Sequence, residues 1–151
     1  MLRDKLINDV KEAMKARDAA RLSTLRMIQA GIKDRDIAAR SKGVTTGIGE
    51  DEILSMFTGM VKQRRDSIAL YEQGNRPELA QKEKDEITLI ESYMPQQLDE
   101  AGVQAAIAKA KAETGAASVK DMGAVMAWLK ANYAGQMDFA KAAQAVRQSL
   151  G

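Results

Sequence analysis

The sequence contains no cysteine and no histidine. Without cysteine the chain can form no disulfide, no zinc–thiolate site and no cysteine nucleophile. Without histidine it lacks the most common general base, the most common activator of a nucleophile and the most common ligand of transition metals. These absences exclude most familiar catalytic sets, and we expect no catalytic residue, no bound metal and no cofactor.

Aromatic residues make up only 4% of the chain, and only two prolines interrupt it, whereas methionine occurs nine times. Sheets are rich in β-branched and aromatic residues, while alanine, leucine and methionine favour helices, so the composition predicts an all-α fold. No apolar run approaches the roughly 18 residues of a membrane span. The segment MLRDKLINDVKEAMK is amphipathic and carries acids, unlike a signal peptide or a typical transit peptide. We therefore expect a cytoplasmic protein.

Hydrophobic periodicity and capping residues predict seven helices. With their caps, these cover approximately residues 2–16, 18–40, 50–73, 77–94, 99–114, 118–134 and 138–150, and GVTTGIG (43–49) is predicted to be a loop. In the first helix, Leu2, Leu6, Val10 and Met14 recur four apart and predict one buried face. Pro95 marks the predicted boundary between two domains. We expect an N-terminal four-helix bundle at 1–95 followed by a small three-helix C-terminal domain at 96–151.

The net charge of +2 is unevenly distributed. Residues 1–42 carry a net charge of +5, residues 43–95 carry −4 and the remainder carries +1. This distribution allows a basic N-terminal face, but the excess is too small to establish a polyanionic partner by itself.

The segment MVKQRRDSI (60–68) concentrates three cations on the third predicted helix. Because a helix advances about 100° per residue, Arg64 falls within the apolar stripe of that helix. Lys62 and Arg65 fall outside the stripe and face solvent, where both remain available to a ligand. A plain solvated face is the alternative interpretation of these two residues.

An inward-facing arginine needs a partner, because burying an unpaired charge is very costly. Glu83 and Glu86 lie on the apolar face of the fourth predicted helix. We therefore predict a structural ion-pair network of Arg64 with Glu83 and Glu86, with Lys33 as an additional neighbour. An exposed anion site and acid–base chemistry remain alternatives.

The segment SVKDMGAVM (118–126) offers a second candidate. The spacing of Ser118 and Asp121 is close to a capping box. Gly123, inside the helix, costs about 1 kcal/mol relative to alanine and so predicts close approach of another backbone or a ligand. Lys120 lies at the start of this helix, where a phosphate could meet free backbone N–H groups.

Five segments in order resemble one known family across nearly the whole chain. They are IKDRDIAAR (32–40), MVKQRRDSI (60–68), EKDEITLIESYMPQQL (83–98), SVKDMGAVM (118–126) and DFAKAAQAVRQSL (138–150). Together they closely resemble the bacterial YqeY family of small helical proteins, while the GVTTGIG loop is the least familiar part. The family is itself similar to the tRNA-contacting tail domain of the glutamine-dependent amidotransferase that converts misacylated Glu-tRNA(Gln) and Asp-tRNA(Asn).

This resemblance implies a four-helix bundle plus a three-helix domain, and tRNA as a partner, with an amidotransferase or a tRNA synthetase as further candidates. The resemblance also implies the activity with which the family is labelled, that of a carbon–nitrogen ligase with glutamine as amido-N-donor. On this basis seven cations are candidate tRNA or anion contacts: Arg26, Lys33, Arg35, Arg40, Lys62, Arg65 and Lys120.

The ligase label does not fit the residues present. Ammonia release from glutamine needs an activated nucleophile, and the kinase half of transamidation needs a cradle for ATP phosphates. GVTTGIG lacks the Lys-Ser/Thr ending of a P-loop. We therefore expect a stand-alone accessory module without catalysis of its own. The alternative is a helical protein–protein adaptor, since the many methionines suit an adaptable helix-binding groove.

Overall fold

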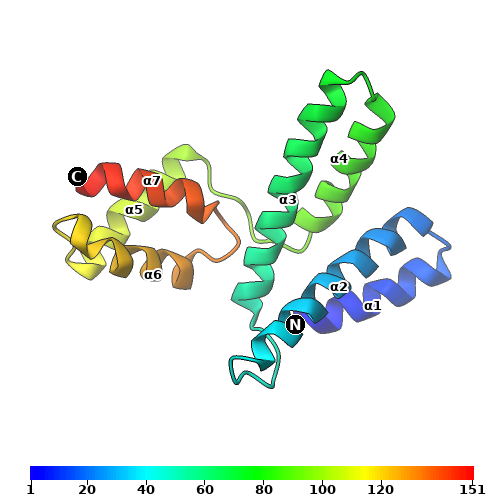
Figure 1. Ribbon diagram of the computed structural model, residues 1–151, viewed down its shortest axis with the longest axis horizontal. Helices are drawn as coiled ribbons and strands as arrows, with labels where there is room; N and C mark the ends of the chain where they lie inside the picture. Colours follow the sequence, from blue (N-terminus) through cyan, green and yellow to red (C-terminus); the bar gives the residue numbers. More distant parts are fainter. The chain divides into compact units, whose positions relative to one another are not determined.

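The computed structural model describes residues 1–151 and consists of seven α-helices and one 3-10 turn (Figure 1). The helices are α1 (Leu2–Lys15), α2 (Ala19–Arg40), α3 (Glu50–Gln73), α4 (Pro77–Glu91), α5 (Glu100–Thr114), α6 (Met122–Asn132) and α7 (Phe139–Leu150), and the turn η1 (Val119–Asp121) precedes α6. No strand is present, so the all-α prediction is confirmed. No helix combines the length and the apolar character that crossing a membrane requires.

Local chemistry explains where several helices begin and end. The side chains of Asp18, Asp99 and Asp138 each accept a hydrogen bond from a backbone N–H in the first turn of α2, α5 and α7. Such caps satisfy N–H groups that have no partner within the helix. Gly115 ends α5 in the left-handed conformation, with φ of 67°, which glycine adopts without a steric penalty.

The first helix differs from its predicted packing. The structure buries Leu6 and Ala13, whereas Met14 is 53% exposed. Steps of four residues drift by about 40° each, so Met14 lies about 80° from Leu6 around the helix, while Ala13 lies nearly in line with it. The prediction of a buried Met14 is therefore wrong, because the repeat of four was followed too far.

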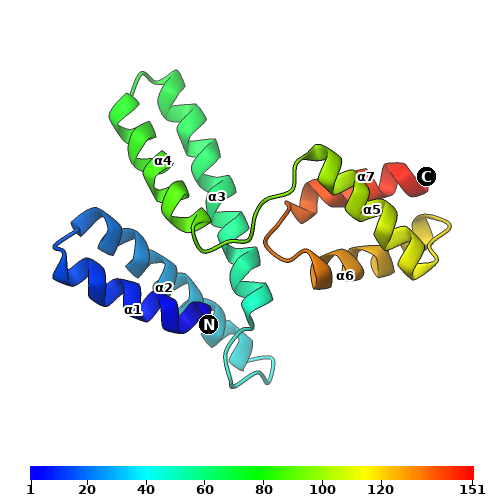
Figure 2. The same cartoon turned by 180° about the vertical axis from the view of Figure 1, so that it is seen from behind.

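The chain divides into two compact units, Met1–Tyr93 and Met94–Gly151. In the first unit, α1 pairs with α2 and α3 pairs with α4 as two antiparallel hairpins, seen from both sides in Figures 1 and 2. The second unit holds α5, η1, α6 and α7. The division into domains at 1–95 and 96–151 stays a prediction.

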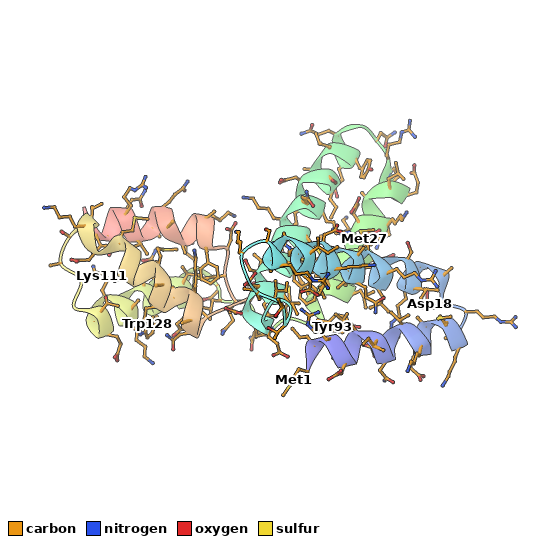
Figure 3. The ribbon with its side chains drawn as sticks, turned by 60° about the horizontal axis from the view of Figure 1, so that its bottom comes forward. Met1, Asp18, Met27, Tyr93, Lys111 and Trp128 are labelled. Atoms are coloured by element: carbon orange, nitrogen blue, oxygen red, sulfur yellow. The ribbon has the colours of Figure 1, made fainter.

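Tyr93, just after α4, ties the two hairpins of the first unit together. Its side chain is buried, its ring lies 6.2 Å from the ring of Phe57, and its hydroxyl donates a hydrogen bond to the carboxylate of Asp9 on α1. The ammonium of Lys5 lies 4.9 Å from the centre of the same ring. Figure 3 labels Tyr93 within the first unit. Burial, together with the Asp9 carboxylate, raises the pKa of Tyr93 above its ordinary value.

The second unit has a core of small and aliphatic side chains. Its buried members are Ala106, Ile107, Ala110, Val125, Leu129, Met137, Ala142 and Val146. Trp128 and Tyr133 lie at the edge of this core, with ring centres 6.0 Å apart. Lys111 donates to the Ser149 hydroxyl at 2.7 Å and so links α5 to α7. The thin core expected of so short a unit is thus supplemented by polar links between helices.

A polar clasp fixes the loop before α3. Arg3 donates two hydrogen bonds to the carboxylate of Asp36 at 2.8 and 2.9 Å and a third to the carbonyl of Ile48 at 2.9 Å. Asp36 also accepts from the N–H of Ile48 at 2.8 Å. At Gly47, with φ of 89°, a Cβ would lie 2.8 Å from the Arg3 guanidinium, so glycine is needed there. The clasp joins α1, α2 and the loop at one end of the first unit.

Because of the clasp, the stability of the folded protein depends on pH. Arg3 first, and then the Ile48 N–H, lower the pKa of Asp36 to about 2, from about 3.9 in an unfolded chain. Because the folded pKa is the lower one, the stabilisation is complete above about pH 4 and is lost as the pH falls towards about 2.

We expect Asp36→Asn to lower the free energy of unfolding by about 1–2 kcal/mol at pH 7, a modest loss because the Arg3 side chain is 40% exposed. The difference between the two proteins should vanish as the pH approaches 2. Urea unfolding of both proteins at several pH values measures it, and other carboxylates cancel in the difference. A difference that stays constant with pH would refute the clasp as its source.

Candidate functional site

The structure brings Arg64, Glu83 and Glu86 together inside the first unit. Arg64 is 8% exposed, its Nε donates to Glu86 Oε2 at 2.8 Å, and Glu83 Oε2 lies 3.8 Å from the same nitrogen. Its Nη1 donates to the carbonyl of Met60 at 3.2 Å, one turn earlier in α3. The helical period thus places Arg64 on the buried side of α3, where it contacts two carboxylates of α4.

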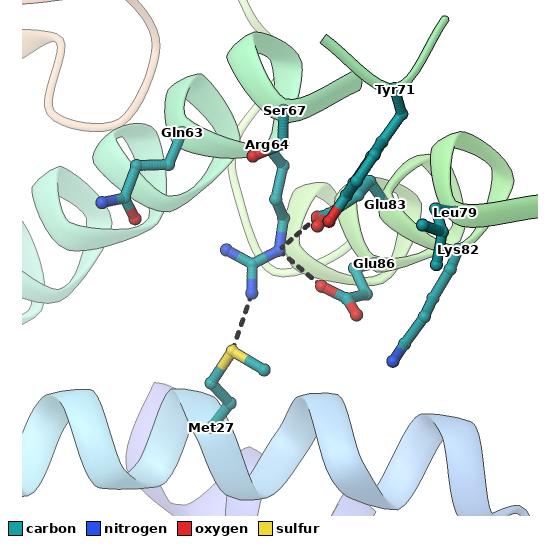
Figure 4. Close-up of a pocket in the computed structure, with 9 residues that line it drawn as sticks. All are labelled: Met27, Gln63, Arg64, Ser67, Tyr71, Leu79, Lys82, Glu83 and Glu86. Atoms are coloured by element: carbon teal, nitrogen blue, oxygen red, sulfur yellow. Dashed lines mark hydrogen bonds and ion pairs between the residues drawn. The ribbon is translucent and has the colours of Figure 1, made fainter. Parts of the chain in front are cut away.

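The remaining guanidinium nitrogen of Arg64 points at a sulfur atom. Its Nη2 lies 2.8 Å from Met27 Sδ, on α2, and Figure 4 shows Met27 reaching up from that helix towards the guanidinium. A cavity of about 440 Å³, open to solvent on one side, lies beside this group. Its walls also include Ser67 and Tyr71 of α3 and Lys82 of α4.

Lys33 is not part of this cluster. It is exposed on α2 and does not line the cavity. It shares its side of α2 instead with Arg26 and Arg40, because residues seven apart differ by only about 20° around a helix. All three are exposed. We name Arg26, Lys33 and Arg40 the α2 basic line.

The other candidate cations of the first unit do not join that line. Arg35 is exposed but lies about half a turn from Arg26 around α2. Lys62 and Arg65 are exposed on α3, and Arg65 Nη2 lies 3.0 Å from Glu91 Oε1 of α4. The candidate contacts therefore occupy several surfaces, and the α2 basic line is their largest aligned group.

Lys120 is exposed in η1, on the second unit. Two backbone N–H groups at the start of this helical segment already have a partner within the chain. Those of Ala117 and Ser118 donate to Asp121 Oδ2 at 2.9 and 3.2 Å. These hydrogen bonds lower the pKa of Asp121. Asp121 therefore places a carboxylate where a phosphate beside Lys120 would have to approach.

The prediction of a close backbone approach at Gly123 is wrong. Gly123 is exposed, and a Cβ built there would meet no atom within 4 Å beyond its own stretch of helix. Local helix propensity cannot distinguish a glycine that makes room for a neighbour from one that merely faces outward.

The sequence shows no sign of two side-chain hydrogen bonds between distant segments, or of one residue that contacts the buried arginine. Arg3 and Asp36 lie 33 positions apart, and Tyr93 and Asp9 lie 84 positions apart. No spacing rule joins residues on different helices, so only the packing of the hairpins reveals these pairs. Met27 was likewise hidden, since a methionine beside an apolar stripe carries no polar signal.

These features define a class of protein: an all-helical chain of two units, with a buried arginine–carboxylate cluster in the first unit and a basic line on one of its helices. The chain belongs to the YqeY family, whose family model, described as Yqey-like protein, matches residues 3–150.

Several curated relatives carry the name "Altered inheritance of mitochondria protein 41, mitochondrial". The protein of Vanderwaltozyma polyspora is 31% identical over 130 residues, which cover 82% of this chain and 68% of that protein. The protein of Lachancea thermotolerans is 34% identical over 91 residues, covering 60% of this chain and 46% of that protein. The protein of Candida glabrata is 37% identical over 89 residues, covering 59% and 47%.

The chain thus spans about half to two thirds of the length of these relatives. Their name describes them as mitochondrial, and a cytoplasmic location for this chain stays a prediction.

Proposed function

We propose that this protein is a tRNA-binding accessory module that works beside an amidotransferase or a tRNA synthetase and is not an amidotransferase by itself. The observation that supports it is the α2 basic line. Arg26, Lys33 and Arg40 are exposed and aligned, and they span about 21 Å along the helix, enough to meet several phosphates. The segment 1–42 that contains them carries a net charge of +5.

The α2 basic line suits recognition of the shape of an RNA rather than of its base sequence. Lysine and arginine side chains on one helix face bind the phosphate backbone, which positions a protein without reading bases. The aromatic content of 4% offers few rings on which unpaired bases could stack. The proposed ligand is therefore the folded backbone of a tRNA.

Fluorescence anisotropy with labelled total tRNA tests this function, with duplex DNA of similar length as the control. We expect submicromolar binding to tRNA at low salt, weaker binding to the DNA, and a steep loss of tRNA affinity when salt is raised from about 50 to 200 mM. Equal affinity for both nucleic acids would overturn tRNA as the ligand, and the absence of binding at low salt would overturn the function altogether.

The protein alone should not form Gln-tRNA. Incubation with Glu-tRNA(Gln), glutamine and ATP should give no product above a reaction without protein, because the sequence offers neither an activated nucleophile nor a phosphate-binding glycine loop. The separation of acylated tRNA species measures it. Turnover in proportion to protein concentration would contradict the accessory role.

A second candidate function, a protein–protein adaptor, is favoured by a different surface. Ile7 and Met14 lie seven residues apart on α1 and are 48% and 53% exposed. They make a short apolar strip of the kind that a partner helix covers. Binding through this strip would be insensitive to salt, which distinguishes it from binding to tRNA.

A further inference from the structure

The cavity beside Arg64 has the size of a small-molecule site. Its volume of about 440 Å³ falls within the range of about 300–1,000 Å³ typical of ligand pockets. It lies wholly in the first unit, between α2, α3 and α4 (Figure 4). The buried, charged side chain of Arg64 reaches into it. The α2 basic line does not contribute to its walls.

Two groups in the cavity keep unused hydrogen-bonding capacity. Arg64 Nη2 has Met27 Sδ as its partner, and a thioether is a weak acceptor. The carboxylate of Glu83 has Arg64 Nε as its polar neighbour, at 3.8 Å, which is too long for a hydrogen bond. The cavity therefore offers one strong donor and one strong acceptor for a ligand.

The charges of the lining restrict what that ligand is. Arg64 and Lys82 are cationic, and Glu83 and Glu86 are anionic, so the four charges cancel. Because these charges cancel, the lining as a whole gives no net attraction to a phosphate or another simple anion, or to a simple amine. A molecule that carries both signs on neighbouring atoms satisfies all four groups.

We propose that this cavity binds a free α-amino acid. The ammonium group lies against Glu83, and the carboxylate meets Arg64 Nη2, with Lys82 at the mouth. The side chain of Met27 moves aside to admit the carboxylate of the amino acid. Its three rotatable bonds and its 43% exposure allow this movement. The amino acid's side chain lies towards Ser67 and Tyr71. This site is independent of tRNA binding by the α2 basic line.

Isothermal titration calorimetry tests the proposal with the full chain. The probes are the twenty common L-amino acids, with sodium acetate and ethylammonium chloride as controls that carry one charge each. We expect at least one amino acid to bind with a Kd below about 1 mM and neither control to bind at ten times that concentration. If no amino acid binds at that level, or if either control binds as well, the proposal is overturned.

Variants locate the binding without unfolding the protein. Glu83→Gln keeps the shape of the side chain and leaves the Arg64–Glu86 pair intact, and Lys82→Gln changes an exposed residue. Each should weaken binding of the amino acid by about tenfold, the scale of a lost charge-assisted hydrogen bond. Lys84→Gln is the matched control, since Lys84 pairs with Glu72 outside the cavity. Equal affinities in all three variants would place the ligand elsewhere and refute this site.

Discussion

Arg64→Met should destabilise the first unit by about 3–5 kcal/mol, the range for breaking a buried ion pair by removing one partner. The substitution leaves the carboxylate of Glu86, whose side chain is 12% exposed, without its closest cation. It also removes the donor to the Met60 carbonyl. Urea unfolding followed by circular dichroism measures the change in the free energy of unfolding.

A neighbouring residue supplies the matched control. Arg65→Met changes the same side chain in the same helix and also removes an ion pair, to Glu91 at 3.0 Å, but Arg65 is 66% exposed. Exposed pairs contribute little, so we expect a loss below about 1 kcal/mol. Equal effects of the two substitutions would contradict the assignment of Arg64 to the interior.

The double variant Arg64→Met/Glu86→Leu separates the cost of an unpaired charge from the value of the pair. Replacing both members of a buried pair with apolar side chains is often neutral or stabilising in proteins, and the carboxylate that remains here, Glu83, is 21% exposed. We expect the double variant to be more stable than Arg64→Met alone. If it is less stable, Glu86 stabilises the fold through contacts other than its pair with Arg64.

The triple variant Arg26→Gln/Lys33→Gln/Arg40→Gln should lose tRNA affinity by on the order of tenfold to 100-fold at low salt, since each cation neutralises phosphate charge. Glutamine has nearly the same helix propensity as lysine and arginine, so α2 should keep its structure. Anisotropy at one fixed low salt concentration measures the loss, and circular dichroism confirms the fold.

The matched control changes three exposed cations of the second unit, in the variant Lys109→Gln/Lys130→Gln/Lys141→Gln. It alters the net charge by the same amount and leaves the α2 basic line intact. We expect it to bind tRNA within about twofold of the unmodified protein. If both triple variants lose affinity equally, binding follows overall charge and the α2 basic line has no special part.

Helix positions follow from local signals, which is why they can be predicted. Three predicted helices, with their caps, begin at residues 18, 99 and 138, and in the structure Asp18, Asp99 and Asp138 each accept a hydrogen bond from the first turn of a helix. Such signals operate within a few residues. The prediction of a buried Met14 is wrong because a repeat of four fits an α-helix only over short distances.

The site depends on contacts between helices, which a single sequence reveals only in part. The inward direction of Arg64 follows from its place in an apolar stripe, and the need for carboxylate partners follows from the cost of an unpaired charge. No sequence pattern indicates Met27 beside the guanidinium or a cavity around it. Those features arise from the approach of α2 to the α3–α4 hairpin, which no local rule describes.

The most direct test of the proposed function is the slope of the logarithm of the tRNA association constant against the logarithm of salt concentration. For binding through the α2 basic line, the unmodified protein should give a steep negative slope, and the triple variant of α2 a slope shallower by about three, one for each lost phosphate contact. Equally steep slopes for both proteins would contradict tRNA recognition by this helix, and a slope near zero for the unmodified protein would contradict it and favour the adaptor.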